Sequence, residues 1–270
     1  MTEGRLTGRV AIVTGAGSRE DGIGNGRAAS VLLARAGAKV ALLDQVKDWA
    51  EHTQRMIADE GGTSMVIETD VTDSAACQRA VEATVAAWGR VDILVNNVGV
   101  GGPPGTAVDV DLAAWDQGLR INVTSMVLMA RHTIPHMRKQ GAGAIVNIAS
   151  VAGLLGGHPN LLYATSKGAI VNMTRAMAAN HGGEGIRVNC IAPGMVYTPM
   201  VHSRGMSDEM RESRRERSLL KVEGTGWDVG NAVVYLASDE ARWVTGVVLP
   251  VDAGATAGMG SLPMSAGTQY

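Results

Sequence analysis

The sequence predicts an α/β fold in which a doubly wound, mostly parallel sheet of seven strands carries helices on both faces. Short runs rich in β-branched residues alternate with longer stretches of helical pattern along the chain. The strand-like runs are almost continuously apolar, which is typical of parallel strands buried on both faces. No linker-like stretch or internal repeat divides the 270 residues, so one domain is expected to span residues 1–270.

The order of the elements follows from these runs. Strands are expected at residues 10–13, 39–43, 65–68, 92–95, 144–148, 187–191 and 246–250. Helices are expected at about residues 23–36, 46–60, 73–88, 112–139, 161–181 and 227–237. Asp73 stands at an N-cap position, and Gly37, Gly61 and Gly89 stand where helices end.

Two late segments differ from this pattern. Residues 201–225 hold six Lys or Arg and five Asp or Glu among few apolar residues. We expect a mobile, salt-bridged helical flap there, and an ordinary exposed helix is the alternative. Residues 255–270 are rich in Gly and other small residues, which predicts an irregular tail.

Composition excludes several classes of protein. A net charge of −2 and a pI near 6.3 argue against a protein that binds nucleic acid through phosphate contacts. The apolar runs fall far short of the roughly 20 residues that span a membrane, and the N-terminus shows no targeting segment. Two cysteines, Cys77 and Cys190, suit a reducing compartment, so a cytoplasmic protein is expected. The chain has no Phe and fourteen Met, so its core must be largely aliphatic.

A glycine-rich turn follows the first strand. It reads Thr14-Gly15-Ala16-Gly17-Ser18, then three residues, then Gly22-Ile23-Gly24. Such a turn between a strand and a helix lets backbone N–H groups approach a pyrophosphate at the helix N-terminus. The strict G-x-G-x-x-G spacing fails here because position 20 is Glu.

Asp44 ends the second strand, twenty residues after Gly24. A carboxylate at this place can accept hydrogen bonds from an adenosine ribose, and it repels a 2′-phosphate. At about 4 Å and an effective dielectric constant near 20, each pair of like unit charges costs roughly 4 kcal/mol. We therefore expect NAD as the cofactor, with NADP less favoured; the alternative for Asp44 is a plain solvent-facing strand end.

Four polar residues at fixed places suggest catalysis. Tyr163 and Lys167 are four residues apart on a predicted helix and so share one face. Ser150 follows the apolar strand upstream, and Asn122 lies in the preceding helix. A free Tyr has a pKa near 10, and a neighbouring ammonium favours the phenolate, so Tyr163 is expected to exchange a proton with an alcohol or ketone.

Together these features resemble the short-chain dehydrogenase/reductase family over about residues 5–254. The turn matches the family's Thr-Gly-x-x-x-Gly-x-Gly signature if Arg19-Glu20-Asp21 is an insertion. Asn96-Asn97-Val98-Gly99 resembles its Asn-Asn-Ala-Gly, and Asn122, Ser150, Tyr163 and Lys167 match its catalytic tetrad. The resemblance implies a Rossmann-type fold and an oxidoreductase that interconverts a secondary alcohol and a ketone with a nicotinamide cofactor.

The resemblance also implies roles for individual residues. Tyr163 would be the general acid/base, Ser150 would orient the substrate oxygen, and Asn122 would hold a water that links Lys167 to solvent. Tyr163 and Lys167 would also contact the cofactor, with Lys167 on its ribose. The other cofactor contacts would be Gly15, Gly17, Ser18, Gly22, Ile23, Gly24, Asp44, Asp70, Val71, Asn97, Gly99, Pro193, Gly194, Val196 and Thr198.

The substrate should lie between the segment after Ser150, the segment 195–200 and the flap. Its expected walls are mainly aliphatic, which favours an apolar or cyclic secondary alcohol or its ketone: Val151, Leu154, Leu155, His158, Tyr197 and Met200. His158 either contacts substrate or faces solvent, and the solvent-facing position is favoured. The same two alternatives apply to Arg19, which either approaches the adenosine phosphates or points into solvent, with solvent favoured.

Three functions stay open from the sequence. The first is an NAD-dependent secondary alcohol dehydrogenase, which Asp44 favours. The second is an NADPH-dependent reductase of the 3-ketoacyl type, and the third is a dinucleotide-binding protein without turnover. No metal, nucleic-acid or membrane partner is expected, and the resemblance implies a homotetramer or homodimer joined through the helices at 112–139 and 161–181.

Overall fold

The computed structural model describes residues 4–19, 22–203 and 205–258. Within this part of the chain, seven strands form one sheet in the order β3-β2-β1-β4-β5-β6-β7. Every neighbouring pair is parallel, so the predicted fold class is confirmed. The strands are β1 (Val10–Thr14), β2 (Lys39–Asp44), β3 (Ser64–Glu68), β4 (Ile93–Asn96), β5 (Gly143–Ile148), β6 (Ile186–Pro193) and β7 (Val248–Val251).

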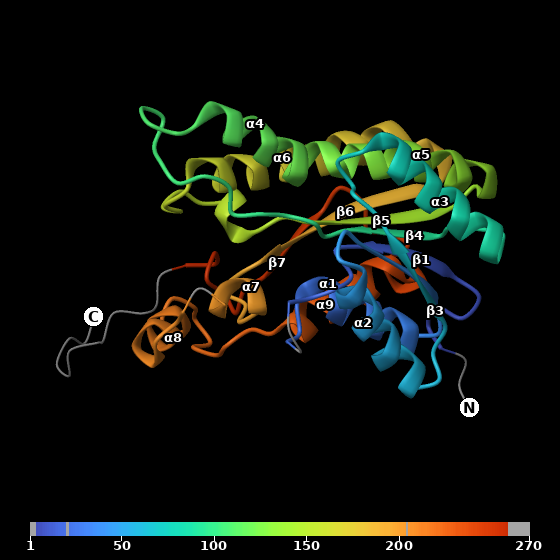
Figure 1. The fold of residues 1–270 in the computed structure, drawn as a ribbon, viewed down its shortest axis with the longest axis horizontal. Coiled ribbons are helices and arrows are strands. Elements are labelled where there is room, and N and C mark those ends of the chain that lie inside the picture. The colour runs from blue at the N-terminus through green and yellow to red at the C-terminus, as the bar shows by residue number, and fades with distance from the viewer. Residues whose placement is uncertain (1–3, 20–21, 204, 259–270) are drawn as a thin grey trace, which may run out of the picture.

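Helices cover both faces of this sheet (Figure 1). One face carries α1 (Asn25–Arg35), α2 (Lys47–Asp59) and α9 (Gly226–Ala237). The other carries α3 (Ser74–Trp88), α4 (Leu112–Leu119), α5 (Ser125–Gln140) and α6 (Leu161–His181). Two short helices, α7 (Pro199–His202) and α8 (Asp208–Arg215), lie beyond the carboxyl end of β6.

The apolar strands divide their side chains between two cores. In β1, Ala11 and Val13 pack toward α1 and α9, whereas Ile12 packs toward α3 and α5. This alternation explains why the strand sequence is apolar at every position. The chain has no Phe, and the second core includes the flexible side chains of Met129 and Met137, which are fully buried among Ile, Val and Leu residues.

The helix expected at 112–139 is interrupted. A π-helical turn at Arg120–Thr124 separates α4 from α5. One such turn barely alters the apolar repeat, so the sequence pattern could not reveal it. It matters because Asn122 lies inside it, and π-helical turns occur frequently at functional sites.

The helix ends follow the predicted capping residues. The Asp73 side chain accepts a hydrogen bond from the Ala75 N–H, and Gly89 ends α3 in the left-handed conformation with φ of 77°. The helix expected from residue 23 begins instead at Asn25, because Gly24 is its extended N-cap. The strand expected at 246–250 is shifted to Val248–Val251.

The flap (residues 201–225) contains ion pairs, as expected. Arg211 pairs with Glu223, and Lys221 Nζ lies 2.8 Å from a Glu216 carboxylate oxygen. Instead of one helix, its described residues hold the end of α7, the helix α8 and irregular chain. The predicted mobility of the flap stays a prediction, and residues 259–270 of the expected tail lie outside the described part.

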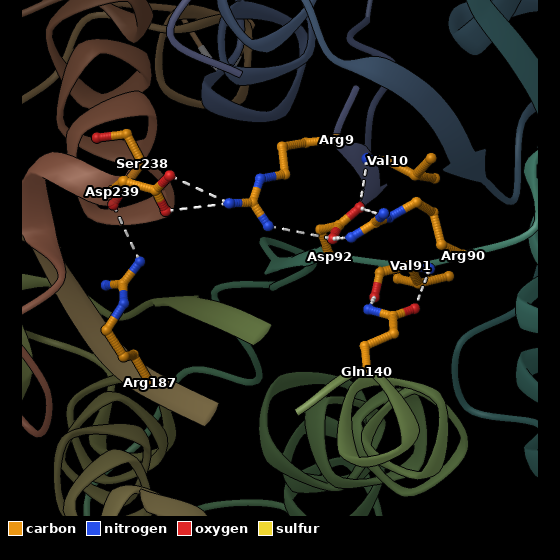
Figure 2. Close-up of polar contacts among 9 residues, drawn as sticks. All are labelled: Arg9, Val10, Arg90, Val91, Asp92, Gln140, Arg187, Ser238 and Asp239. Carbon is orange, nitrogen blue, oxygen red and sulfur yellow. Dashed lines mark hydrogen bonds and ion pairs between the residues drawn. The ribbon is translucent and has the colours of Figure 1, made fainter. Parts of the chain in front are cut away.

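A polar network joins elements at the amino ends of the strands, away from the cleft described below (Figure 2). The buried Asp92 carboxylate accepts from the Val10 N–H at 2.9 Å and from Arg90 Nε at 2.8 Å. Arg9 lies between Asp92 and the exposed Asp239. Asp92 therefore ties the start of β1 to the residues that lead into β4.

Among the described residues, no helix is both long enough and apolar enough to cross a membrane.

Candidate active site

A cleft of about 370 Å³ runs along the carboxyl ends of the central strands. It is lined by residues that follow β1, β2, β3 and β4 and by Tyr163 and Lys167 of α6. The chain runs outward in opposite directions from β1 and β4, so the cleft lies at the switch point of the sheet. Ligands of open α/β sheets bind at such points.

The glycine-rich turn forms the floor of the cleft. Gly15 has a φ of +62°, a conformation that side chains rarely adopt. A Cβ on Gly17 would lie 2.5 Å from the Cβ of Trp49, so only glycine allows α2 to approach the turn. Because neither position carries a side chain, the backbone of the turn borders the cleft directly, and the Gly17 N–H donates to the Asp44 carboxylate.

The N-terminus of α1 points into this cleft. Its N-cap is Gly24, and the structure shows no side-chain hydrogen bond that caps it. Asn25, which lines the cleft, has a buried Oδ1 with no hydrogen-bond partner within the described residues. Uncapped N–H groups and the positive end of the helix dipole suit a phosphate, so this part fits the pyrophosphate of a dinucleotide.

Gly26, in the first turn of α1, is a residue of the site that the sequence reasoning missed. A Cβ at Gly26 would lie 1.9 Å from the carbonyl oxygen of Gly15. Glycine there permits α1 to pack directly against the end of β1. The spacing Gly24-x-Gly26 was the available signal.

Asp44 lies inside the cleft and is only 8 % exposed, which excludes a plain solvent-facing strand end. Its carboxylate accepts hydrogen bonds from the backbone N–H groups of Gly17 at 2.9 Å and Val46 at 3.0 Å. Burial raises the pKa of Asp44, while these backbone donors and the charge of Arg27 oppose the rise. The carboxylate is thus held in a defined orientation inside the cleft.

The Asn97 and Asp70 side chains form hydrogen bonds that fix the loops around the cleft. Asn97 Nδ2 donates to the carbonyl oxygens of Thr14 at 3.1 Å and Gly15 at 3.0 Å, which fixes the start of the glycine-rich turn. The Asp70 carboxylate accepts from the backbone N–H and the hydroxyl of Thr72. Both residues border the cleft.

Tyr163, Lys167 and Ser150 meet at the other end of the cleft. Lys167 Nζ lies 5.6 Å from the centroid of the Tyr163 ring, and the Ser150 hydroxyl lies near enough to the Tyr163 hydroxyl to lower its pKa. Lys167 is 4 % exposed and donates to the carbonyl oxygen of Ile148 at 3.0 Å. Burial lowers the pKa of Lys167 to about 8.

The Tyr163 pKa differs from the expectation. The sequence predicted a lowered value through Lys167, but burial raises the pKa of Tyr163, and the neighbouring Ser150 hydroxyl only partly offsets this rise. The reason is geometric: Lys167 is bonded to Ile148 and lies 5.6 Å from the ring centroid. Ser150 is therefore the group that favours the phenolate most directly in this structure.

Asn122 is fully buried and does not line the cleft. Its side chain accepts from the Val100 N–H at 2.8 Å and donates to the Val100 carbonyl oxygen at 2.9 Å. It also donates to the hydroxyl of Ser166 at 2.9 Å, and Ser166 in turn donates to the Tyr163 carbonyl oxygen. Asn122 thus joins the loop after β4 to the catalytic end of α6, and Ser166 is a member of this network that the sequence did not single out.

Most of the predicted cofactor contacts lie in the cleft. Those that line it are Gly15, Gly17, Ser18, Gly24, Asp44, Asp70, Val71, Asn97, Gly99, Tyr163, Lys167 and Thr198. Those that lie outside its lining are Gly22, Ile23, Pro193, Gly194 and Val196. Pro193 is buried within β6, and the Gly194 N–H donates to the carbonyl oxygen of Val251. Both residues therefore support the sheet instead of lining the cleft.

The residues expected to form the substrate walls differ in their exposure and in whether they line the cleft. Leu154, Leu155 and Met200 are exposed apolar side chains, with Met200 also in the cleft lining, and Val151 is partly buried. Tyr197 is covered by the flap, because the Arg211 guanidinium lies 4.2 Å from its ring centroid. His158 is exposed, as favoured, yet its ring centroid lies only 4.6 Å from that of Tyr163.

Two arginines lie near the glycine-rich turn. Arg19 is exposed, as favoured, but it borders the cleft with its guanidinium 5.9 Å from the Trp49 ring centroid. Glu20 and Asp21 of the insertion lie outside the described residues. Arg27, which the sequence reasoning did not single out, is fully buried under the turn.

The fold and the site are those of a dinucleotide-binding oxidoreductase, because a glycine-rich turn before an uncapped helix N-terminus, the buried Asp44 carboxylate and Tyr163 share one cleft at the switch point of the sheet. The described residues contain no group of three or more His, Cys, Asp or Glu that could hold a metal ion.

Comparisons with known proteins agree with this class. The model of a family described as enoyl-(acyl carrier protein) reductase matches residues 16–256. The cis-4-hydroxycyclohexanecarboxylate dehydrogenase of Sinomonas cyclohexanicum is 36 % identical over 249 residues, covering 92 % of this chain and 97 % of that protein.

Two solved structures extend the likeness to three dimensions. The crystal structure of levodione reductase superposes with a TM-score of 0.88 at 33 % identity and covers 93 % of this chain and 99 % of that one. A 7α-hydroxysteroid dehydrogenase complexed with NADH and 7-oxo glycochenodeoxycholic acid has a TM-score of 0.86 at 33 % identity, covering 96 % and 97 %. The chain belongs to the short-chain dehydrogenase/reductase family, whose members use nicotinamide dinucleotides, and it is an oxidoreductase.

Proposed function

We propose that this protein is an NAD-dependent dehydrogenase that interconverts a secondary alcohol and a ketone. The observation that carries the proposal is the meeting of Ser150, Tyr163 and Lys167 at one end of a cleft that holds Asp44 at the other. The named activities of the relatives support it, since levodione reductase and cis-4-hydroxycyclohexanecarboxylate dehydrogenase act on a ketone and on an alcohol.

Tyr163 would move the proton. In oxidation its phenolate takes the proton of the substrate hydroxyl, and in reduction its hydroxyl returns a proton to the ketone oxygen. The Ser150 hydroxyl, which lies beside that of Tyr163, would orient the substrate oxygen toward the same atom. The nicotinamide, when bound, accepts the hydride in one direction and donates it in the other.

Lys167 and Asn122 would have supporting parts. Lys167 holds an ammonium beside Tyr163 and is placed to hold the nicotinamide ribose hydroxyls from the border of the cleft. Asn122 keeps the loop after β4 and the start of α6 together through Val100 and Ser166. The water that links Lys167 to solvent near Asn122 stays a prediction.

The preference for NAD follows from Asp44. Its carboxylate borders the cleft where an adenosine ribose would lie and is oriented by Gly17 and Val46. It would accept from ribose hydroxyls and repel a 2′-phosphate. Arg19 at the rim is a counterweight, but its exposure screens its charge more than that of the buried Asp44. The NADH complex of the 7α-hydroxysteroid dehydrogenase supports the same choice.

The substrate is proposed to be apolar or cyclic. Leu154, Leu155 and Met200 offer exposed apolar surface on the segments that flank Tyr163. The relatives' names include cyclic alcohols and ketones, which supports this class. An NADPH-dependent 3-ketoacyl-type reductase is the second candidate, favoured only by the basic Arg19 near the turn.

A panel of secondary alcohols and ketones, read by NADH absorbance with NAD and NADP in parallel, tests the proposal. We expect turnover of cyclic secondary alcohols with kcat/KM at least tenfold higher for NAD. Tyr163→Phe should lower kcat by about 10²–10⁴-fold while NAD still binds, because the proton transfer is lost. A preference for NADPH would instead favour the second candidate.

The matched control is Tyr235→Phe, which removes a phenol hydroxyl from the α9 surface far from the cleft. It should leave turnover unchanged. Undiminished oxidation in Tyr163→Phe would contradict the mechanism, and dinucleotide binding without turnover of any alcohol or ketone would leave a binding protein as the better description.

A further inference from the structure

Arg27 is the most deeply buried charged side chain near the cleft. It is the third residue of α1, directly beneath the glycine-rich turn, and its exposed fraction is 0 %. Arginine is almost never fully buried in proteins unless its donors are satisfied. The free-energy cost of burying this charge falls at the base of the proposed dinucleotide site, so the contacts of the guanidinium must offset it.

The guanidinium binds both ends of the lengthened part of the turn. Arg27 Nη1 donates to the carbonyl oxygen of Gly22 at 2.6 Å, and Nη2 donates to the carbonyl oxygen of Ser18 at 3.1 Å. These two residues flank positions 19–21, the three residues that exceed the family's spacing. One planar guanidinium thus bonds to the residues on both sides of positions 19–21.

The same guanidinium reaches α2. Its Nε donates to the hydroxyl of Thr53 at 3.2 Å, and Nη2 approaches the carbonyl oxygen of Trp49 at 3.4 Å. The Thr53 hydroxyl in turn donates to the carbonyl oxygen of Ala16 at 2.8 Å. Three backbone carbonyls of the turn, those of Ala16, Ser18 and Gly22, are therefore fixed by one network.

A peptide group is planar, so a hydrogen bond to the Ser18 or Gly22 carbonyl also fixes the direction of the N–H that follows it, on Arg19 or Ile23. This matters for an anion, because a turn binds phosphate only when its N–H groups converge. Only a guanidinium offers several donors in a rigid fork, so an ammonium cannot replace it at two separated carbonyls.

We propose that Arg27 is a positioning residue for dinucleotide binding, whose guanidinium clamps the Ser18 and Gly22 carbonyls and so keeps the lengthened glycine-rich turn in its phosphate-binding shape. The inference rests on the proposed function only in that a dinucleotide occupies the cleft. Arg27 also acts on the adenosine end of the cleft, since its charge opposes the burial that raises the pKa of Asp44.

Arg27→Met tests the clamp, because methionine keeps an unbranched apolar stem and removes every donor. Titration calorimetry of NAD into the cofactor-free protein should show a dissociation constant raised at least tenfold. The KM for NAD should rise in parallel, while kcat at saturating NAD and the KM for the alcohol change less than threefold. A residue that served only to stabilise the fold would lower the unfolding temperature and leave the dissociation constant of the folded protein unchanged.

Two further variants sharpen the result. Arg35→Met, on the same helix, removes an exposed guanidinium that pairs with Glu60 and lies 5.2 Å from the Trp227 ring centroid, and it should leave NAD binding unchanged. Arg27→Lys keeps the charge but loses the fork, so its dissociation constant should also rise at least tenfold. Wild-type binding by Arg27→Lys would overturn the clamp.

If Arg27→Met does not fold, Thr53→Val tests the same network. It removes the acceptor of Arg27 Nε and the donor to Ala16 at almost constant volume, and we expect a three- to tenfold rise in the NAD dissociation constant. Unchanged NAD binding in Arg27→Met, or in Thr53→Val where the first variant is unfolded, overturns the inference while the proposed function stands. A wild-type protein that binds neither NAD nor NADP overturns both.

Discussion

The Asp44 carboxylate accepts a hydrogen bond from the backbone N–H of Gly17 at 2.9 Å. The residue proposed to bind the adenosine ribose is thereby joined to the turn proposed to bind the pyrophosphate. A Cβ on Gly17 would lie 2.9 Å from Asp44 Oδ2, so the contact also requires glycine. Because the turn holds the carboxylate in place, its orientation toward a ribose costs little further conformational entropy.

Asp44→Asn should reduce the preference for NAD. The amide keeps the size of the side chain but removes the negative charge that repels a 2′-phosphate. We expect the ratio of kcat/KM for NAD to that for NADP to fall at least tenfold, measured by steady-state kinetics with both cofactors. Asp70→Asn is the matched control, since Asp70 also follows a strand but is occupied by Thr72, and it should change the ratio less than threefold. An unchanged ratio in Asp44→Asn would exclude Asp44 as the selecting residue.

The buried Lys167 should make stability depend on pH. Burial lowers its pKa to about 8 from the ordinary value of 10.5, so the folded protein binds fewer protons than the unfolded chain between these two values. The cost of burying the ammonium is fully present below pH 8 and is relieved as the pH rises toward 10.5.

Lys167→Met removes this cost at every pH. The free energy of unfolding of wild type, relative to the Met variant, should therefore rise by about 2 kcal/mol between pH 7 and pH 10, measured by urea unfolding. The loss of the hydrogen bond to Ile148 adds a constant offset and leaves the slope unaffected. A difference independent of pH would show that Lys167 keeps its ordinary pKa.

Sequence patterns revealed the sheet and the ends of its strands because both rest on local composition. The apolar runs fix which segments are strands, and polar residues that directly follow them, such as Asp44 and Ser150, must gather at one edge of a parallel sheet. The four-residue spacing of Tyr163 and Lys167 fixes their shared face in the same way. These inferences need no knowledge of long-range packing.

Other features depend on contacts between distant segments. From the sequence alone, Arg27 looks like an ordinary exposed helix residue. In the fold it is buried, because α2 and the glycine-rich turn pack over it. The stacking of His158 on Tyr163 depends on the path of an irregular loop. The raised pKa of Tyr163 depends on burial that spacing alone cannot measure, so the expected lowering by Lys167 was wrong for this structure. One available signal was overlooked: Arg27 lies among the small residues Gly26 and Ala28 on the buried side of its helix.

Arg211 should influence substrate binding more than cofactor binding. Its guanidinium pairs with Glu223, with Nε 2.6 Å from a carboxylate oxygen, and lies 4.2 Å from the Tyr197 ring centroid. It therefore fastens α8 to the segment that carries Tyr197. Arg211→Gln removes both the partly exposed ion pair and the cation–π contact, so it should raise the KM for the alcohol about fivefold.

Steady-state kinetics with varied alcohol and varied NAD distinguish the two effects of Arg211→Gln. The KM for NAD should stay within twofold of wild type. Arg215→Gln, on the same helix, removes a partly exposed pair with Glu212 and a weaker attraction to Glu223 but no contact with Tyr197, and it should change both constants less than twofold. An equal rise in both KM values would point to a general loosening of the fold instead.

Asp92 should be important for stability but not for activity. It is 4 % exposed, accepts from Val10 and Arg90 and pairs with Arg9 at the amino ends of the strands, the opposite edge from the cleft (Figure 2). Asp92→Asn removes the charge from a buried network and turns one acceptor into a donor that faces other donors. We expect a loss of about 2–4 kcal/mol in the free energy of unfolding, measured by urea unfolding.

Asp239→Asn provides the comparison within the same network. Asp239 also pairs with Arg9, but its side chain is 83 % exposed, so solvent replaces the lost interaction and the expected change is within about 0.5 kcal/mol. Both variants should keep the wild-type kcat at temperatures where they are folded, because neither residue approaches the cleft. Equal destabilisation by the two substitutions would mean that burial of Asp92 adds nothing, whereas a large loss for Asp92→Asn alone assigns the stability to the carboxylate that joins β1 to the start of β4.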